Sequence, residues 1–338
     1  MNEIFLDAAW GKPVSTIPVW FMRQAGRSLP GYRALREKYD VLTLAQTPEL
    51  AARVSLEPIE RLGVDAAILF ADIMLLPIAM GIDVRIVDSV GPIVDAPLRA
   101  IEDLERLRPF AAERIAYLQE TIRILRGELK VPLIGFSGAP FTLASYLIEG
   151  KPSRTWTVTK RVMYEEPEMW RHMMEILSDG VIGYLKVQID AGAQAVQLFD
   201  SWVGCLSPAD YRAYVLPYMQ KIFTALKDTK IPRIHFATNT AGFLADFSNV
   251  DCEVIGVDWR IELAYAKEIV GSKALQGNLD PTILLADWPV IKGKVDALLA
   301  GIDPINPKTG YIFNLGHGIL PETDDAKVRK LVEYIHGL

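Results

Sequence analysis

Eight short runs of apolar, β-prone residues recur along the chain and alternate with longer stretches of helical period. This alternation is typical of successive βα units around a parallel sheet. The predicted strands are residues 19–22, 66–70, 133–136, 195–199, 233–236, 254–257, 274–276 and 311–314. Eight parallel strands with helical crossovers favour a closed (β/α)8 TIM barrel of the α/β class, and an open doubly wound sheet is the alternative.

Helix starts lie between these runs. Thr47 stands before Pro48, and Ser207 stands before Pro208 with Asp210 three residues after it. A cap residue followed by proline at the first helical position is a typical helix start, which indicates that the crossovers are helical.

The sequence between these runs indicates how many domains the chain forms. No Pro/Gly/Ser-rich linker, charge run or repeat interrupts the chain, so residues 1–338 are predicted to form one domain. Residues 77–109 are rich in Gly, Pro and Asp and too long for an ordinary connection. We expect this segment to be an insertion that covers one end of the barrel.

Composition and charge exclude several classes of protein. Half of the 338 residues are hydrophobic and 23% are charged, which is enough apolar material for a large core. The formal charge of -6 gives no general attraction to nucleic acid or to an anionic membrane. The first residues are acidic and carry no long apolar run, so we expect neither a signal peptide nor a spanning helix, and a cytoplasmic location.

The motifs of familiar cofactor and metal sites are missing. The two cysteines, Cys205 and Cys252, belong to no CxxC or Cys/His pair and are interpreted as packing residues. The sequence also contains no GxxxxGK, GxGxxG, GxSxG or HExxH segment. We therefore expect no disulfide, no metal and no cofactor.

Polar residues follow most of the predicted strands, where a barrel carries its reactive groups. They are Arg23, Gln24, Arg27, Asp72, Ser137, Gly138, Asp200, Ser201 and His317. Because the carboxyl ends of parallel strands meet at one face, these side chains are expected at one mouth.

Arg23 and Arg27 are four residues apart, so a helical turn would place both guanidinium groups on one side. A guanidinium binds a carboxylate through two parallel hydrogen bonds, which predicts a ligand with carboxylates. Pairing with surface acids such as Glu37 is the alternative.

Asp72 follows a buried strand, where a charge is costly unless cations or N–H groups face it. Its alternative role is to cap the following loop.

The histidines and Tyr146 are less constrained. His317 lies in NLGHG, where glycines allow the backbone to approach a ligand, so it is the best-placed histidine. His172 and His336 fall in helical stretches, and His235 is interpreted as a core residue of a strand. The phenol of Tyr146 can donate to a substrate or simply pack within a helix, and spacing leaves both open.

Two long segments resemble the signatures of the uroporphyrinogen decarboxylase family. They are PVWFMRQAGRSLPGYRALRE (residues 18–37) and GFSGAPFTLASYLIEG (residues 135–150). Further similar stretches are LFADIMLLP, QLFDSWVG, VIGVDW, LQGNLDP and FNLGHGILPET, so the likeness spans nearly the whole chain. It departs from the family after the fifth strand, where HFATNTAGF replaces a glycine-rich segment.

This resemblance implies a (β/α)8 barrel that removes four acetate carboxyls from uroporphyrinogen III to give coproporphyrinogen III, without metal or prosthetic group. The residues that match the family's substrate-binding and catalytic positions are Arg23, Gln24, Arg27, Asp72, Tyr146, Ser201 and His317. Asp72, Arg23 and Tyr146 are the catalytic candidates among them, with Arg36 as a further carboxylate ligand. We also expect a homodimer.

Two other functions are weighed against this one. The related barrel methyltransferases would need a Cys/His set for zinc, and His235 has no cysteine at the next alternate position. A protein that only stores or carries an anionic tetrapyrrole would explain the arginines but leave Asp72 without a role.

Overall fold

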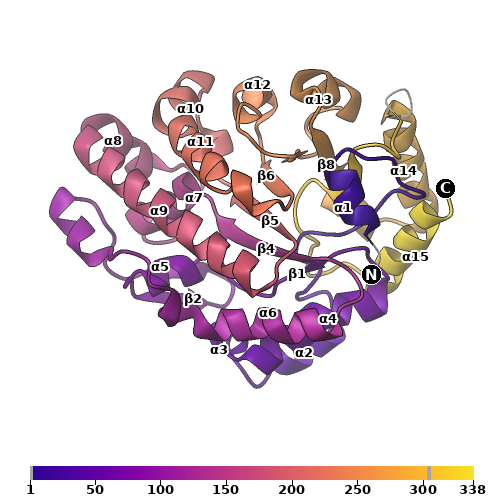
Figure 1. Cartoon of the computed structure of the whole chain (residues 1–338), viewed down its shortest axis with the longest axis horizontal. Coiled ribbons are helices and arrows are strands. Elements are labelled where there is room, and N and C mark those ends of the chain that lie inside the picture. The colour runs from indigo at the N-terminus through magenta and orange to yellow at the C-terminus, as the bar shows by residue number, and fades with distance from the viewer. Residues whose placement is uncertain (1–2, 303–305) are drawn as a thin grey trace.

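The computed structural model describes residues 3–302 and 306–338 and shows parallel strands enclosed by helices (Figure 1). The strands of the central sheet are β1 (Ala67–Ile68), β4 (Leu133–Gly138), β5 (Ala195–Asp200), β6 (Arg233–Ala237), β7 (Val254–Gly256), β8 (Ala274–Leu279) and β9 (Tyr311–Leu315). They are hydrogen-bonded in the order β1-β4-β5-β6-β7-β8-β9, and all of these pairs are parallel. Sequential parallel order is the order of a barrel rather than of a doubly wound sheet.

Residues 18–22 complete the ring between β9 and β1. Val19 forms a parallel bridge with Phe313, and Phe313 N donates to Pro18 O at 2.9 Å. On the other side, Asp65 N donates to Val19 O at 2.8 Å, while Val19 N donates to Asp65 Oδ2 at 2.8 Å. Because a side-chain carboxylate takes the place of a backbone carbonyl, this segment occupies a strand position without forming a regular ladder.

The structure confirms the positions of the predicted strands in the ring and corrects several of their bounds. Residues 19–22 are a bridged segment and not a strand, and the second strand is only Ala67–Ile68. The third and seventh predicted strands, in contrast, are longer than expected and end at Gly138 and Leu279. Every residue of β4, β6, β8 and β9 is buried, as in parallel strands that helices cover from outside and side chains from within.

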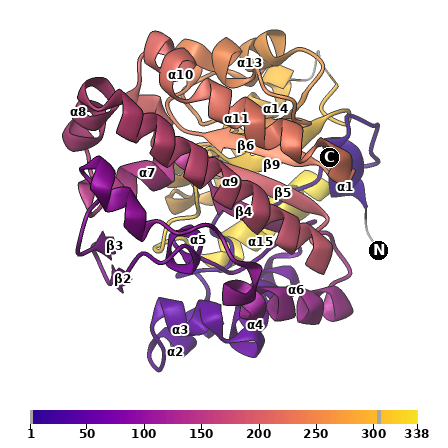
Figure 2. The same ribbon diagram turned by 60° about the vertical axis from the view of Figure 1, so that its left-hand side comes forward.

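The outer layer is helical (Figures 1 and 2). The α-helices are α1 (Ile4–Ala9), α2 (Pro30–Arg36), α3 (Val41–Gln46), α4 (Pro48–Leu62), α5 (Leu75–Ala79), α6 (Ala116–Glu128), α7 (Pro140–Glu149), α8 (Thr157–Glu165), α9 (Pro167–Ala191), α10 (Pro208–Tyr214), α11 (Leu216–Ala225), α12 (Leu244–Phe247), α13 (Leu263–Val270), α14 (Trp288–Ile302) and α15 (Asp325–His336). Short 3-10 helices are η1 (Ile101–Arg106), η2 (Ala112–Ile115), η3 (Val203–Cys205), η4 (Lys227–Thr229), η5 (Ala241–Phe243) and η6 (Pro281–Leu285). Within the described residues, no helix is both long enough and apolar enough to cross a membrane.

Both predicted helix starts are confirmed. Pro48 begins α4, and Pro208 begins α10 with Ser207 as its cap, whose hydroxyl accepts from Asp210 N at 3.1 Å. The cap of α2 comes from another helix, because the carboxylate of Glu57 on α4 accepts from Gly31 N and Tyr32 N. This contact fixes the helix that carries Arg33 and Arg36.

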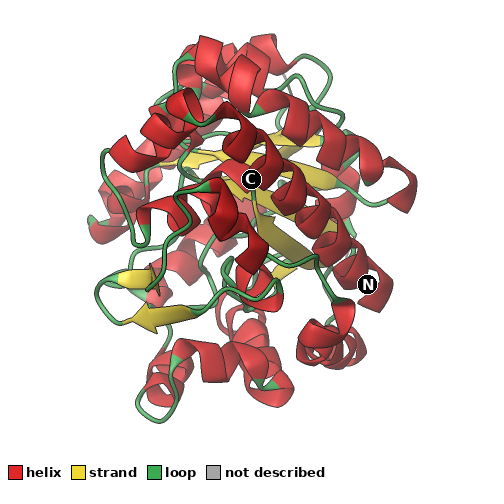
Figure 3. Cartoon of the chain, turned by 90° about the vertical axis from the view of Figure 1, so that its left-hand side faces the viewer, coloured by secondary structure: helices red, strands yellow, loops and turns green. Residues whose placement is uncertain are grey.

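The segment predicted as an insertion contains an antiparallel hairpin, β2 (Val84–Val87) and β3 (Gly91–Val94), followed by η1. Figure 3 shows this hairpin standing apart from the central strands. It is tied to the end of α7, since Val94 N donates to Gly150 O at 2.8 Å. Its tip reaches α2, where Asp88 pairs with Arg36 at 2.5 Å.

The interior of the barrel contains a chain of polar contacts among apolar side chains. Trp20 Nε1 donates to Gln276 Oε1 at 2.9 Å, and Gln276 Nε2 donates to Gln197 Oε1 at 2.9 Å. All three side chains are buried, so each bond acts where an unpaired amide would be costly. The chain links residues 18–22 to β8 and β5 through the middle of the barrel.

The structure also bears on the predictions for His235 and for the two cysteines. His235 is fully buried in β6 and stacks on Phe247 with ring centroids 3.7 Å apart, and burial lowers its pKa to about 3, as for a core histidine. Both cysteines are free thiols, Cys252 buried and Cys205 half-buried.

Candidate active site

The carboxyl ends of the strands meet at one end of the barrel, referred to below as the mouth. The predicted site residues Arg23, Asp72, Ser201 and His317 all lie in loops that leave this end. Tyr146 comes from α7, which begins directly after β4. The mouth therefore receives groups from five different positions around the ring.

Arg23 stands at the centre of this group. Its charge interacts with those of Arg27, Asp72 and Tyr146, and it also acts on His317. Partial burial lowers the pKa of Arg23, Arg27 adds to this effect, and the groups of Tyr146 and Asp72 oppose it. Four of the predicted residues thus share one electrostatic environment with Arg23.

The backbone of Arg23 is held in an unusual conformation. Its φ is 61°, in the left-handed region that side chains other than glycine rarely adopt. The preceding residue is fixed to β9, because Met22 N donates to Asn314 Oδ1 at 3.2 Å. Such a conformation persists where the surroundings determine it, and it is frequent at functional sites.

Gln24 also holds this loop in place. Its side chain is fully buried; Oε1 accepts from Phe21 N and Nε2 donates to Ala66 O, each at 2.9 Å. The amide therefore links the loop to the residue before β1 instead of extending into the mouth. A substrate contact of Gln24 stays a prediction, and the backbone would have to make it.

Asp72 follows β1 and is half-buried. Its Oδ1 accepts from Met74 N at 2.8 Å, which caps the turn into α5. Burial raises the pKa of Asp72, while the bond to Met74 and the charge of Arg23 hold it down. The loop cap weighed for this carboxylate is present in the structure, whereas its role as a partner of the arginines stays a prediction that the charge of Arg23 supports.

Tyr146 is half-buried and stacks on Trp202, with ring centroids 3.9 Å apart and planes at 27°. Trp156 packs edge-on against Trp202, with ring centroids 5.9 Å apart. Burial raises the pKa of Tyr146, Asp72 raises it further, and Arg23 opposes both, so the phenol is neutral near pH 7. It is a hydrogen-bond donor rather than a base.

Asp200, the last residue of β5, lies two residues before Trp202. It is fully buried, and its Oδ1 accepts from Thr142 Oγ1 at 2.8 Å. The same hydroxyl accepts from Trp202 N at 3.3 Å. Burial raises the pKa of Asp200 to about 7, against hydrogen bonds from Thr142 that lower it. This network fixes Trp202, and through it the ring of Tyr146.

Ser201 lies between Asp200 and Trp202 and is half-buried. Its carbonyl accepts from Thr238 Oγ1 at 3.0 Å, so the loop after β6 supports the loop after β5. Thr238 belongs to the segment that departs from the family pattern. The next residue, Asn239, has φ 60°, a conformation that asparagine tolerates in place of glycine.

His317 follows β9 and has a defined tautomer. Gly318 N donates to His317 Nδ1 at 2.7 Å, so in the neutral ring the proton is on Nε2. Burial lowers the pKa of His317 to about 4, helped by Arg23 and Arg260 and opposed by Asp258. Near pH 7 the imidazole is a neutral donor through Nε2.

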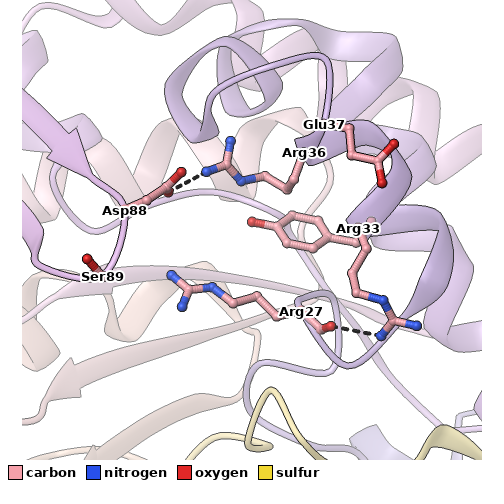
Figure 4. Close-up of a pocket in the computed structure, with 7 residues that line it drawn as sticks. Arg27, Arg33, Arg36, Glu37, Asp88 and Ser89 are labelled. Atoms are coloured by element: carbon pink, nitrogen blue, oxygen red, sulfur yellow. Dashed lines mark hydrogen bonds and ion pairs between the residues drawn. The ribbon is translucent and has the colours of Figure 1, made fainter.

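A cavity of about 300 Å³ adjoins Arg27 at the edge of the mouth. Figure 4 shows Arg27, Arg33 and Arg36 on one side and Asp88 and Ser89, at the hairpin tip, facing them. The guanidinium of Arg33 is used locally, since Nη1 donates to the carbonyls of residues 27 and 28. Arg36 is paired with Asp88 through Nη2.

No three His, Cys, Asp or Glu side chains within residues 3–302 and 306–338 are arranged to hold a metal ion. The sequence did not single out Thr142, Trp202 or Arg260. Trp202 and Arg260 each lie within three residues of the end of a predicted strand, which is the signal that would have found them.

Solved structures show the same fold. A methyltransferase from Methanosarcina mazei superposes with a TM-score of 0.79 at 21% identity, covering 99% of this chain and 97% of that chain. A putative vitamin-B12 independent methionine synthase from Listeria monocytogenes gives a TM-score of 0.57 at 14% identity, with 97% of each chain covered. At these identities the likeness concerns the fold alone.

Closer relatives share the sequence. Proteins named uroporphyrinogen decarboxylase are 50% identical in Salinispora tropica, over 99% of this chain and 90% of the relative, and 48% identical in Thermus thermophilus, over 99% and 98%. The relative from Bacillus subtilis is 47% identical over 99% of this chain and 95% of its own length. The family model described as uroporphyrinogen decarboxylase (URO-D) matches residues 1–338. With this match, and with Arg23, Asp72, Tyr146 and His317 gathered at one mouth, the chain belongs to the uroporphyrinogen decarboxylase family.

Proposed function

We propose that this protein removes the four acetate carboxyl groups of uroporphyrinogen III to give coproporphyrinogen III and CO2, a step of porphyrin and haem biosynthesis. The observation that carries the proposal is the arrangement of Arg23, Asp72, Tyr146 and His317 in one electrostatic cluster at the barrel mouth. Relatives that carry this activity in their names are 47 to 50% identical over nearly the whole chain.

The site matches the chemistry of the substrate. Uroporphyrinogen has acetate and propionate carboxylates at its edge and pyrrole N–H groups at its centre. Arg27 and Arg36, beside the cavity at the edge of the mouth, suit the carboxylates because a guanidinium binds them with two parallel bonds. Asp72 suits the centre, since a half-buried carboxylate gains most from N–H donors that replace water.

The reaction needs an electron sink, and the substrate supplies it. A proton added to the pyrrole carbon beside the acetate arm creates an iminium. The bond between the methylene and the carboxylate carbon then breaks, CO2 leaves, and its electron pair restores a neutral nitrogen. A second proton converts the exocyclic methylene to methyl while the ring carbon loses the first proton, so each acetate consumes one proton overall.

In this scheme Asp72 stabilises the positive charge that develops on the ring. A fixed carboxylate in a site shielded from water acts strongly on such a charge, because its orientation costs no reorganisation during the reaction. Tyr146 and His317 are neutral near pH 7 and would orient the reacting arm as hydrogen-bond donors.

Arg23 is our candidate for the proton donor. A guanidinium is a poor acid in water. In the mouth its pKa is lowered by partial burial and by the charge of Arg27, which favours proton release. His317, with a pKa of about 4, carries little charge near neutral pH and is a weaker candidate for this role.

A cytoplasmic location, a homodimer and a single domain over residues 1–338 complete the proposal. One apolar core cluster includes side chains from Phe5 to Ile335, which supports the single domain. Light scattering of the purified protein would test the homodimer, and limited proteolysis followed by mass mapping would test the single domain. A monomer, or a stable fragment that folds alone, would contradict the respective part.

The activity is tested by anaerobic incubation with uroporphyrinogen III, oxidation of the products and chromatography. We expect species with seven, six and five carboxyls to appear in turn and to end in coproporphyrin. Metal analysis of the same preparation should find no stoichiometric zinc. Unchanged uroporphyrin with the substrate retained on the protein would instead favour a carrier, and stoichiometric zinc a methyltransferase.

A further inference from the structure

Arg260 lies at the mouth but belongs to a part of the ring from which no substrate contact was predicted. It follows β7 in the loop that leads to α13. Its Nη1 donates to Asp258 Oδ2 at 2.5 Å, and its Cζ lies 4.1 Å from the ring centroid of Trp259. The side chain of Asp258 is 2% exposed, whereas that of Arg260 is 44% exposed.

The loop that carries Arg260 is tied at several points. Asp258 Oδ2 also accepts from Asn239 N at 2.8 Å, which joins the loop to the end of β6. Asn278, in β8, donates to the carbonyls of Asp258 at 2.8 Å and of Ile261 at 2.7 Å. A guanidinium held by an ion pair, an aromatic face and a fixed backbone loses little freedom when a ligand binds.

The loop also lies against the loop of His317. A Cβ placed on Gly316 would lie 2.5 Å from Trp259 N and 2.7 Å from its Cε3, so only glycine allows this approach. The charge of Arg260 reaches the next residue, because it contributes to the lowered pKa of His317. The loops that carry Arg260 and His317 therefore lie side by side, close enough for the charge of Arg260 to act on His317.

The position of Arg260 differs from that of the predicted arginines. In the ring, β8 and β9 lie between β7 and residues 18–22, which lead to Arg23 and Arg27. A macrocycle with carboxylates around its whole edge needs cations on more than one side of the mouth. One bond to Asp258 does not exhaust the five N–H donors of the guanidinium.

We infer that Arg260 is a substrate-binding residue that holds a carboxylate of the macrocycle on the β7 side of the mouth. This inference rests on the proposed function, because the ligand is the same tetrapyrrole. Asp258 and Trp259 are positioning residues for the guanidinium and Asn278 holds their loop. Arg260 itself acts on binding rather than on the chemical step.

The test compares Arg260→Gln and Arg260→Lys in the purified protein, with uroporphyrinogen III as substrate. Glutamine keeps an N–H donor for Asp258 but removes the charge, and lysine keeps the charge but loses the planar fork. We expect KM to rise about tenfold or more in Arg260→Gln with kcat within about threefold, and to rise less in Arg260→Lys. Raised salt should increase the wild-type KM more than that of Arg260→Gln.

Arg61→Ala is the matched control. Arg61 on α4 is also 44% exposed and pairs with Asp325 on α15 at 2.6 Å, among the outer helices. The KM and kcat of the Arg61→Ala variant should equal those of the wild type. Thermal unfolding followed by circular dichroism checks that all variants are folded.

The outcomes separate the two proposals. A folded Arg260→Gln variant with the KM of the wild type would overturn the role of Arg260 while leaving the decarboxylase activity intact. A wild-type protein that releases no CO2 from uroporphyrinogen III would overturn the proposed function itself. A tenfold fall of kcat at unchanged KM would also contradict the inference, since it would place Arg260 in the chemical step.

Discussion

The side chain of Arg23 lies directly over the backbone of Gly318. A Cβ placed on Gly318 would lie 2.3 Å from Arg23 Cδ and 2.6 Å from its Cγ. Real Cβ contacts are never this short, so any side chain at this position must move the arginine. Gly318 is therefore required for the position of the proposed proton donor.

Gly318→Ala is predicted to lower kcat about tenfold or more while the barrel stays folded. The added methyl displaces the side chain of Arg23, whose charge acts on Asp72 and Tyr146, and small misplacements at reacting centres are costly. Steady-state assays with uroporphyrinogen III measure the effect. Gly293→Ala is the control, since Gly293 lies inside α14 with no atom near its Cβ position, and there alanine should be neutral or slightly stabilising.

Asp72→Asn is predicted to lower kcat at least about a hundredfold without unfolding the protein, because the amide cannot stabilise positive charge on the ring. The bond from Met74 N to Oδ1 can be kept by the amide oxygen, so the turn into α5 should survive. CO2 release from labelled acetate arms measures the activity. Asp95→Asn, at an exposed carboxylate that pairs with Arg85, should have no effect. Full turnover by Asp72→Asn would remove this residue from the mechanism.

Arg27→Ala is predicted to raise KM about tenfold with a smaller change in kcat, because an exposed cation beside the 300 Å³ cavity contributes to binding. The wild-type KM should also rise with salt, and the variant should be less sensitive. Measurements at low and high ionic strength give both results. Unchanged KM and kcat would contradict a carboxylate contact at this position.

Asp200→Asn is predicted to change how stability depends on pH. The pKa of Asp200 is about 7 in the folded chain, above its ordinary 3.8, because burial disfavours the charge. Between these pH values the folded state holds a proton that the unfolded state has lost, so stability falls as pH rises through this window. The Asp200→Asn variant does not lose stability in this way, because its amide does not titrate.

The comparison is made by urea unfolding of both proteins at several pH values. The free energy of unfolding of Asp200→Asn minus that of the wild type should increase by about 3 kcal/mol between about pH 5 and pH 8. All other groups titrate alike in both proteins and cancel. Parallel curves would show that Asp200 keeps an ordinary pKa in the folded state.

Periodicity predicted the fold because parallel strands covered on both faces are continuous apolar runs, as in β4 and β8. It failed at residues 19–22 for a physical reason. The partner of Val19 N is the carboxylate of Asp65, a residue 46 positions away that no local pattern relates to it. The apolar run was correct as a ring position and wrong as a hydrogen-bonded strand.

For the site, the rule that polar groups follow strands located Arg23, Asp72 and His317. The same rule could not distinguish a residue that reaches the mouth from one that holds the loop, because both are polar and near a strand end. Gln24 shows this, since its amide is used by Phe21 N and Ala66 O. An aromatic support such as Trp202 lies three residues after a predicted strand but is missed, because the rule applies to polar residues alone.

The segment of residues 18–22, which completes the ring between β9 and β1, has a consequence for synthesis of the chain. Met22, which precedes Arg23, is fixed by Asn314, 292 positions later, and Arg23 rests on Gly318. A nascent polypeptide that has not yet emerged beyond these late residues lacks the groups that place its earliest arginine. The conformation of Arg23 therefore depends on contacts that form only when β9 and the loop after it have folded against residues 18–22.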